Sequence, residues 1–247
     1  KEDFLMKKKI KNIITNTPYR ISLGGGGTDL PFYYKEKGGY LISASIDQYI
    51  TTHIAERKLD DKIFLQYSET EWADNIDNIK HEIIKLILKF YNMTKGIQVG
   101  TYSSMPTYTG LGASSALIVG LVNAFIKLKN QNKTKLEIAE IAYHIERVLL
   151  KLEGGFQDQY ITSLGGIQVI EIDKEGKVSC KPLKIGPGSL KELQTSLVLV
   201  HTKINRRSDD IIKAQYDSNM AMDCYDEIKE IGKDSSKYLI NGDCEKL

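Results

Sequence analysis

The stretch MPTYTGLGASSALIVG, residues 105–120, places a glycine-rich turn between an extended segment and an apolar helix that we expect to begin near Ser114. Backbone N–H groups at a helix start are unpaired and carry the positive end of the helix dipole, so they attract an anion. Gly110 and Gly112 allow the chain to fold closely around a phosphate, while Ser114 and Ser115 add hydroxyl groups. The stretch therefore predicts a phosphate-binding loop, with a serine-capped buried helix as the alternative.

Two familiar phosphate-binding patterns do not fit this loop. A Walker loop has the form GxxxxGK[ST], and residues 105–120 contain no lysine. A dinucleotide-binding fingerprint requires a third glycine where this chain has Ser115. Neither of these two sites is therefore indicated.

The composition is that of an ordinary soluble globular chain. Its 247 residues, of which 41% are hydrophobic and 27% charged, suffice for one large domain or two smaller ones. The net charge of +2 gives no support to a nucleic-acid or membrane partner. Cys180, Cys224 and Cys244 show no CxxC spacing, which argues against a disulfide framework or a zinc site and fits the cytoplasm. The longest apolar stretch, residues 117–122, is too short to span a bilayer.

Hydrophobic periodicity divides the chain into strands and helices. Alternation and β-branched residues predict strands over residues 9–23, 40–58 (one long or two short), 62–68, 96–106, 165–173 and 196–202. Apolar residues at helical spacing predict helices over residues 75–91, 114–128, 135–152 and, with mixed charge, from 208 onward. We expect a domain boundary within residues 184–193.

A second glycine-rich stretch, RISLGGGGTDLP at residues 20–31, has four consecutive glycines before an acid. Glycine loses more backbone freedom on folding than any other residue, so four in a row are costly to order. Either something approaches this backbone closely, or the run is an ordinary flexible turn.

Two carboxylates further along the chain are candidate functional groups. Glu146 lies at the edge of the apolar stripe of the expected 135–152 helix. A carboxylate turned inward there needs a divalent metal, Arg147 or hydrogen-bond donors, and a tilted surface position is the alternative. Asp158 lies between two glycine pairs in GGFQDQYITSLGG, residues 154–166. An acid in such a turn is a candidate general base, with an ordinary turn aspartate as the alternative.

Taken together, and in this order, these segments resemble the motifs of the GHMP small-molecule kinases over residues 9–175. Arg20 and Asp29 keep the nine-residue spacing of the family's first motif. The loop PTYTGLGASSA resembles its ATP-phosphate motif, and Glu146 and Asp158 follow in the family order.

The resemblance implies a GHMP kinase fold of the α/β (α+β) class. Residues 1–185 would form a ribosomal-S5-like ATP-binding domain, and residues 186–247 the start of a truncated, ferredoxin-like C-terminal domain. The family has a third glycine-rich motif, whereas no glycine-rich segment follows residue 188 here. We therefore expect the chain to stop inside its second domain.

The resemblance also implies roles for individual residues. Asp158 would be the catalytic base with Arg20 beside it, and Mg²⁺ would bind to Ser114 and Glu146. The ATP-binding residues would be Pro106, Gly110, Leu111, Gly112, Ala113, Ser114 and Ser115. The sugar would bind at Gly26, Gly27, Thr28 and Asp29, where bare glycine backbone leaves room for a bulky substrate.

Within the family, GGGGTDLP and GFQDQY are most similar to the kinases of heptose 7-phosphate, with the fucokinases next. Gly26 and Gly27 stand where galactokinases have Glu and His, which argues against galactose. The implied reaction is ATP-dependent phosphorylation of the anomeric hydroxyl of D-glycero-D-manno-heptose 7-phosphate to the 1,7-bisphosphate, in nucleotide-activated heptose biosynthesis. The alternatives are another sugar kinase such as L-fucokinase, or a non-catalytic sugar or nucleotide sensor. The expected partners are ATP and a sugar phosphate, and a homodimer is left open.

Overall fold

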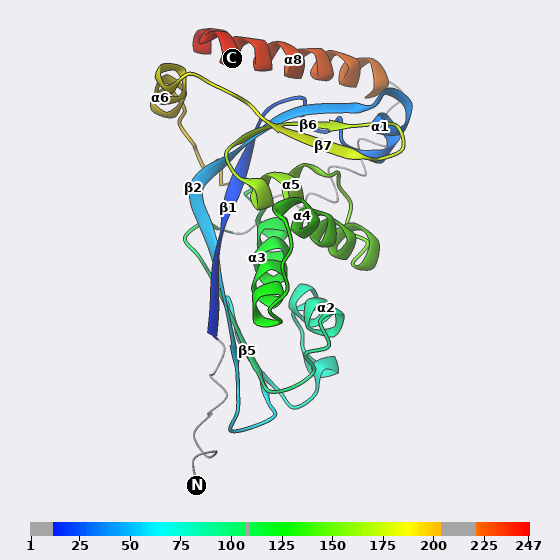
Figure 1. Cartoon of the computed structure of the whole chain (residues 1–247), viewed down its shortest axis with the longest axis vertical. Coiled ribbons are helices and arrows are strands. Elements are labelled where there is room, and N and C mark those ends of the chain that lie inside the picture. The colour runs from blue at the N-terminus through cyan, green and yellow to red at the C-terminus, as the bar shows by residue number, and fades with distance from the viewer. Residues whose placement is uncertain (1–11, 107–108, 204–220) are drawn as a thin grey trace.

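The computed structural model describes residues 12–106, 109–203 and 221–247. One mixed β-sheet with helices packed against it makes up most of this part of the chain, which confirms the expected mixed α/β class (Figure 1). The strand expected over residues 9–23 is β1 (Asn12–Gly24), and the one expected over residues 40–58 is a single strand, β2 (Gly39–Glu56).

The long strand β2 organises the sheet, because it pairs with three other strands. Along one edge it runs antiparallel to β1. On its other edge, Gly39–Ala44 pair with β6 (Ile167–Ile172), whereas Ile50–Glu56 pair with β5 (Ile97–Ser103). Figure 1 shows β2 passing from the β6 side of the sheet down to β5. The strand β2 thus joins the two halves of one sheet.

Shorter strands complete the two halves of the sheet. Next to β5 lie β3 (Ile63–Gln66), which is parallel to it, and the edge strand β4 (Thr70–Ala73). Next to β6 lies β7 (Val178–Pro182). The sequence pattern did not predict β4 or β7, which are only four and five residues long.

The central helix α3 (Ala113–Leu128) packs on β1 and β2 and forms the middle of the core. Most of its residues are buried, as the apolar pattern of residues 114–128 predicts. Around it lie α2 (Glu82–Phe90), α4 (Lys135–Tyr143) and α5 (Gln157–Leu164). The hydroxyl of Thr15 on β1 donates to the carbonyl of Gly120, which ties α3 to the sheet.

Two of the expected helices are interrupted. The segment 75–91 divides into a 3₁₀ turn, η1 (Ile76–Asn78), and α2. The reason is that Asn75 and His81 each accept a backbone N–H with their side chains and so begin a separate helix. The segment 135–152 is α4 followed by a π-helical turn, η2 (His144–Leu149).

The remaining helices lie toward the chain ends: α1 (Pro31–Lys37), α6 (Pro187–Ser196), α8 (Ala221–Asn241) and the 3₁₀ turn η3 (Cys244–Lys246). The α8 helix fulfils the helical pattern expected after residue 208, and residues 204–220 lie outside the described residues. Among the described residues, no helix has the length and apolar character needed to cross a membrane. The division into domains at residues 185 and 186 stays a prediction.

The strand expected over residues 196–202 does not form. Ser196 ends α6, and residues 197–202 are neither helix nor strand and have no partner strand in the described sheet. Val198 is 80% exposed and Val200 72% exposed. Apolar alternation makes a strand only where a neighbour supplies the ladder hydrogen bonds, and the described part of the chain offers none here.

The glycine run is packed against the protein's own backbone. A Cβ on Gly25, whose φ is +75°, would lie 2.1 Å from the carbonyl oxygen of Tyr40. A Cβ on Gly232 of α8 would lie 2.9 Å from the Cα of Gly25, and one on Gly27 would lie 2.7 Å from the Tyr225 ring. The expectation that these glycines leave room for a substrate is therefore wrong for Gly25 and Gly27, because β2 and α8 fill that space.

We expect Gly25→Ala to lower the free energy of unfolding by about 2–4 kcal/mol, because the new methyl group meets backbone and the residue must adopt a left-handed conformation. Urea unfolding followed by circular dichroism measures this change. Gly188→Ala is the control, since Gly188 has no atom within 4 Å of its Cβ position. Equal stability of the two variants would contradict the packing of α8 and β2 on the glycine run.

Candidate active site

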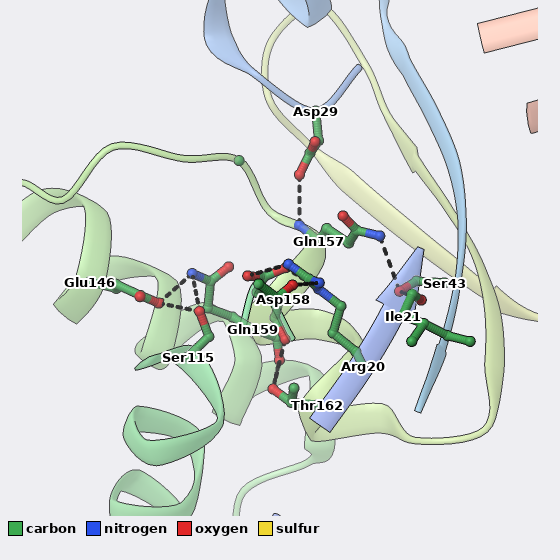
Figure 2. Close-up of polar contacts among 12 residues, drawn as sticks. Arg20, Ile21, Asp29, Ser43, Ser115, Glu146, Gln157, Asp158, Gln159 and Thr162 are labelled. Carbon is green, nitrogen blue, oxygen red and sulfur yellow. Dashed lines mark hydrogen bonds and ion pairs between the residues drawn. The ribbon is translucent and has the colours of Figure 1, made fainter. Parts of the chain in front are cut away.

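A two-point ion pair joins the first strand to the helix that carries Asp158. Arg20 Nε donates to Asp158 Oδ1 at 2.6 Å, and Arg20 Nη2 donates to Oδ2 at 2.9 Å (Figure 2). The two side chains are only 16% and 20% exposed. The structure therefore brings together the two residues expected to be catalytic, although 138 positions separate them.

The surroundings shift the pKa values of Asp158 and the nearby Asp29 in opposite directions. Burial alone would raise the pKa of Asp158, but the charge and hydrogen bonds of Arg20 outweigh it and hold this pKa below its usual value. Burial raises the pKa of Asp29, and the charge of Asp158 adds to the effect, although the N–H of Gln157 opposes it. Asp158 is thus held in its ionised form.

Asp158 belongs to the first turn of α5 and is not part of an open turn between glycines. The backbone N–H of Gln157, at the start of α5, donates to Asp29 Oδ2 at 2.8 Å. Asp29 is only 4% exposed, and through this hydrogen bond its carboxylate holds the beginning of the helix in place. The Gln157 amide donates to Ser43 on β2, and the Ser43 hydroxyl donates to the carbonyl of Ile21 (Figure 2).

The loop before α3 closes over the ion pair. Arg20 Nη1 donates to the carbonyl oxygen of Gly110 at 2.6 Å. The backbone N–H of Arg20 donates to the carbonyl oxygen of Leu111 at 3.1 Å. Gly112 has a φ of +76°, and a Cβ there would lie 3.3 Å from Arg20 Cγ and 3.4 Å from Asp158 Oδ2. Pro106 and the described part of this loop, from residue 109, lie on either side of residues 107 and 108, which fall outside the described residues.

The start of α3 has no side-chain cap, which argues against the alternative of a serine-capped helix. Its N-cap is Gly112, and Ala113 is the first helical residue. The Ser114 hydroxyl is buried and, among the described residues, has no hydrogen-bond partner. This helix start therefore presents unpaired N–H groups and an unused hydroxyl, a combination that can bind a phosphate or its counter-ion.

Glu146 is buried in the π-helical turn η2 and is 2% exposed. Its Oε2 accepts hydrogen bonds from Ser115 Oγ at 2.6 Å and from Gln159 Nε2 at 2.5 Å. Arg147 Nη1 is 3.7 Å from Glu146 Oε1, and the guanidinium also donates to the carbonyls of Glu153 and Gly155. Of the two orientations that the sequence leaves open for Glu146, the structure shows the inward one, and hydrogen-bond donors satisfy part of its need for partners.

Ser114 and Glu146 are a chemically suitable pair for a magnesium ion. Magnesium prefers oxygen ligands and takes one or two protein carboxylates together with substrate phosphates. The unpartnered buried hydroxyl of Ser114 and the carboxylate of Glu146 supply oxygen atoms of this kind, and their role as metal ligands stays a prediction. In the described part of the chain, no group of three or more His, Cys, Asp and Glu side chains could hold a metal without a substrate.

The residues before Asp29 contact β1, β2, α8 and their own segment. The Thr28 hydroxyl donates to the carbonyl oxygens of Gly25 and Tyr40, and Thr28 is fully buried. Gly27 lies against Tyr225 of α8, while Gly26 is half-buried near Ser22. The sugar-binding role of Gly26, Gly27, Thr28 and Asp29 stays a prediction.

Sequence reasoning missed the two glutamines around Asp158, Gln157 and Gln159, as functional candidates. Both are buried and both use their side-chain amides in hydrogen bonds. The signal was present in the letters QDQ, since buried glutamines need partners. Their partners Ser43, Ser115 and Glu146 are too distant in sequence to be identified from the pattern.

We expect Asp158→Asn to lower the free energy of unfolding at pH 7 by about 2 kcal/mol, because Arg20 loses its charged partner. The lowered pKa of Asp158 means that its carboxylate stabilises the fold above the unfolded value of about 3.9. That contribution is lost as the pH falls through the folded value. The deficit of the variant should therefore shrink in denaturant titrations carried from pH 7 toward pH 3.

Asp29→Asn supplies the matched comparison with the opposite sign. The raised pKa of Asp29 means that the ionised form costs stability at neutral pH, and this cost disappears as the pH falls through the folded pKa. Wild type should therefore gain stability relative to Asp29→Asn on acidification. Parallel pH slopes for the two variants would contradict the assignment of the two carboxylates.

Comparisons with known proteins agree with this geometry. The model of the GHMP kinases N terminal domain matches residues 78–166. A D-glycero-alpha-D-manno-heptose 7-phosphate kinase of Campylobacter jejuni is 35% identical over 214 residues, which cover 82% of this chain and 63% of the relative. The chain therefore spans less than two thirds of that kinase.

Two solved structures share the fold over nearly the whole chain. One from Campylobacter jejuni is 32% identical, with a TM-score of 0.75, and the match covers 96% of this chain and 72% of that one. A D-glycero-D-manno-heptose 1-phosphate kinase from Bacteriodes thetaiotaomicron is 26% identical, with a TM-score of 0.81, covering 96% of this chain and 75% of that one. The chain belongs to the GHMP kinase family.

Proposed function

We propose that this protein is an ATP-dependent sugar kinase that phosphorylates the anomeric hydroxyl of D-glycero-D-manno-heptose 7-phosphate. The observation that carries the proposal is the position of the Arg20–Asp158 pair directly beneath the glycine loop at the start of α3. An ionised acid is thereby placed next to a helix start that suits a nucleotide phosphate.

The proposed chemistry is an in-line phosphoryl transfer. The sugar hydroxyl oxygen forms a bond to the γ-phosphorus of ATP while the bond from that phosphorus to the β–γ bridging oxygen breaks, and ADP leaves. Asp158 accepts the proton of the hydroxyl and releases it to solvent after the transfer. Its lowered pKa keeps the carboxylate free to accept that proton at neutral pH.

Arg20 and the start of α3 supply the electrostatic part of the reaction. The guanidinium orients Asp158 by two hydrogen bonds, and its positive charge lies beside the loop that would cradle the phosphates. The residues that would bind ATP are Pro106, Gly110, Leu111, Gly112, Ala113, Ser114 and Ser115. Preorganised donors of this kind are commonly the largest contribution to phosphoryl transfer.

Magnesium would be held by Ser114 and Glu146 together with the phosphates. When bound, it neutralises negative charge on the β- and γ-phosphates of ATP. The fit rests on the unpartnered Ser114 hydroxyl and on the buried Glu146 carboxylate.

The choice of a heptose phosphate follows the relatives. The Campylobacter jejuni relative is a heptose 7-phosphate kinase, and the Bacteriodes thetaiotaomicron structure is described as a heptose 1-phosphate kinase. We propose the 7-phosphate as substrate because the Campylobacter jejuni heptose 7-phosphate kinase is 35% identical to this chain, whereas the Bacteriodes thetaiotaomicron protein is 26% identical. The three cysteines are free thiols, which suits a cytoplasmic enzyme.

A coupled assay of ADP release across a panel of sugars tests this proposal. With Mg-ATP present, we expect turnover on D-glycero-D-manno-heptose 7-phosphate that exceeds that on heptose 1-phosphate, L-fucose and galactose. Preferred turnover on L-fucose would replace the proposed substrate. Nucleotide binding without turnover on any sugar would favour a sensor.

Asp158→Asn should lower turnover by about 10²–10⁴-fold on the best sugar of the panel, because the base is lost while the size of the side chain is kept. Nucleotide affinity, measured by calorimetry with a non-hydrolysable ATP analogue, should stay near that of wild type. Ser163→Ala is the control on the same helix, since the Ser163 hydroxyl donates to Lys135 outside the site. Turnover of Asp158→Asn within about threefold of wild type would remove Asp158 from the mechanism.

A further inference from the structure

Three elements meet at the Glu146 carboxylate, and α5 contributes a residue without an assigned role. Gln159 lies next to Asp158 on α5, one position further along the helix. Its Nε2 donates to Glu146 Oε2 at 2.5 Å and lies within hydrogen-bond distance, 3.3 Å, of Ser115 Oγ on α3 (Figure 2). Gln159 is completely buried.

The donors around Glu146 are arranged unevenly. Gln159 and Ser115 both donate to Oε2 and neither donates to Oε1. The group that faces Oε1 is the Arg147 guanidinium, 3.7 Å away, and its N–H groups donate to the carbonyls of Glu153 and Gly155. Because Glu146 Oε2 accepts the hydrogen bond, the Gln159 amide turns its nitrogen toward it. Two donors thus fix Oε2, whereas Oε1 has an ion-pair contact with Arg147 and accepts neither of these two hydrogen bonds.

The same amide is poorly satisfied on its other side. Gln159 Oε1 is buried and has no hydrogen-bond partner in the part of the chain that the structure describes. A buried acceptor without a partner costs free energy, and an apolar side chain of similar shape would avoid that cost. The glutamine at this position is therefore explained by the hydrogen bond from its Nε2 to Glu146, and not by its Oε1.

We infer that Gln159 is a positioning residue for the metal ligand Glu146. It holds Oε2, together with Ser115, and so leaves Oε1 as the oxygen that binds the divalent cation of Mg-ATP. Because Gln159 follows Asp158 directly, the same helical turn places the base and the metal ligand relative to each other. This inference rests on the proposed function, in which Glu146 binds magnesium.

Calorimetry of a non-hydrolysable ATP analogue, with Mg²⁺ and with a chelator, tests the inference without using activity. The measured quantity is the factor by which magnesium strengthens nucleotide binding. Gln159→Met, which keeps length and removes both polar atoms, should reduce this factor by about 10–100-fold, the usual effect of removing a hydrogen bond to a metal ligand. Binding without magnesium should stay within about threefold of wild type, because the glycine loop is unchanged.

Gln157→Met is the matched control. Gln157 is also a buried glutamine of α5, but its amide donates to Ser43 and not to Glu146. It should keep the magnesium factor of wild type. Glu146→Gln is the reference for complete loss of the ligand, and Gln159→Met should approach it. Circular dichroism melting shows that each variant is folded.

Gln159→Leu is the second variant, in case Gln159→Met does not fold. It also removes both polar atoms of the side chain, so it should also lose the magnesium factor. A folded Gln159 variant with the wild-type factor, alongside a large loss in Glu146→Gln, would overturn the role of Gln159 alone. A wild-type protein whose nucleotide affinity is independent of magnesium would overturn the metal site of the proposed function, and this inference with it.

Discussion

The bidentate pair between Arg20 and Asp158 is the interaction on which the rest of the site depends. It joins β1 to the first turn of α5, and Arg20 extends it to the carbonyl of Gly110. Both charges are largely removed from water, so neither can lose the other without leaving an uncompensated charge behind. Gly112 favours this close approach of the glycine loop, because it has a left-handed φ of +76° and no Cβ to contact Arg20 and Asp158. The position of the α3 start relative to Asp158 follows from that contact.

The first turn of α5 makes hydrogen bonds to three other parts of the molecule. The N–H of Gln157 holds Asp29, Asp158 holds Arg20, and Gln159 holds Glu146. Consecutive helical residues point about 100° apart, so one turn can reach the glycine run, the first strand and the π-helical turn together. A small displacement of α5 would change all three contacts at once. The site is therefore a property of this helix start more than of any single loop.

The parts that the sequence predicted are those set by local chemistry. The glycine turn before a buried helix at residues 110–128 depends on left-handed glycines and on apolar periodicity, both visible in the letters. Pairing of Arg20 with Asp158 came from a family resemblance, because nothing local links positions so far apart. The burial of Glu146 was not predicted from its surroundings, because its partners Ser115 and Gln159 are distant in sequence. The absence of a strand over residues 197–202 was missed because it depends on the lack of a partner strand in the described sheet. The glycine run was misread for the same reason, because the atoms that crowd it belong to Tyr40 and α8.

The two buried aspartates show how this packing bears on the proposed chemistry. Asp158 belongs to the first turn of α5, and Asp29 contacts that turn through the N–H of Gln157. Only Asp158 forms the ion pair with Arg20, and the pKa values of the two acids shift in opposite directions. Environments that drive two acids apart in this way commonly give them different roles. Asp158 is the one kept ionised, which supports it as the proton acceptor of the proposed reaction. Asp29 accepts the N–H of Gln157 and sits in a segment braced by Tyr40 and by α8 through the glycines before it. The glycine run thus contributes to the site indirectly. It allows β2 and α8 to pack closely on the segment that holds Asp29, and Asp29 in turn binds the start of the helix that carries Asp158.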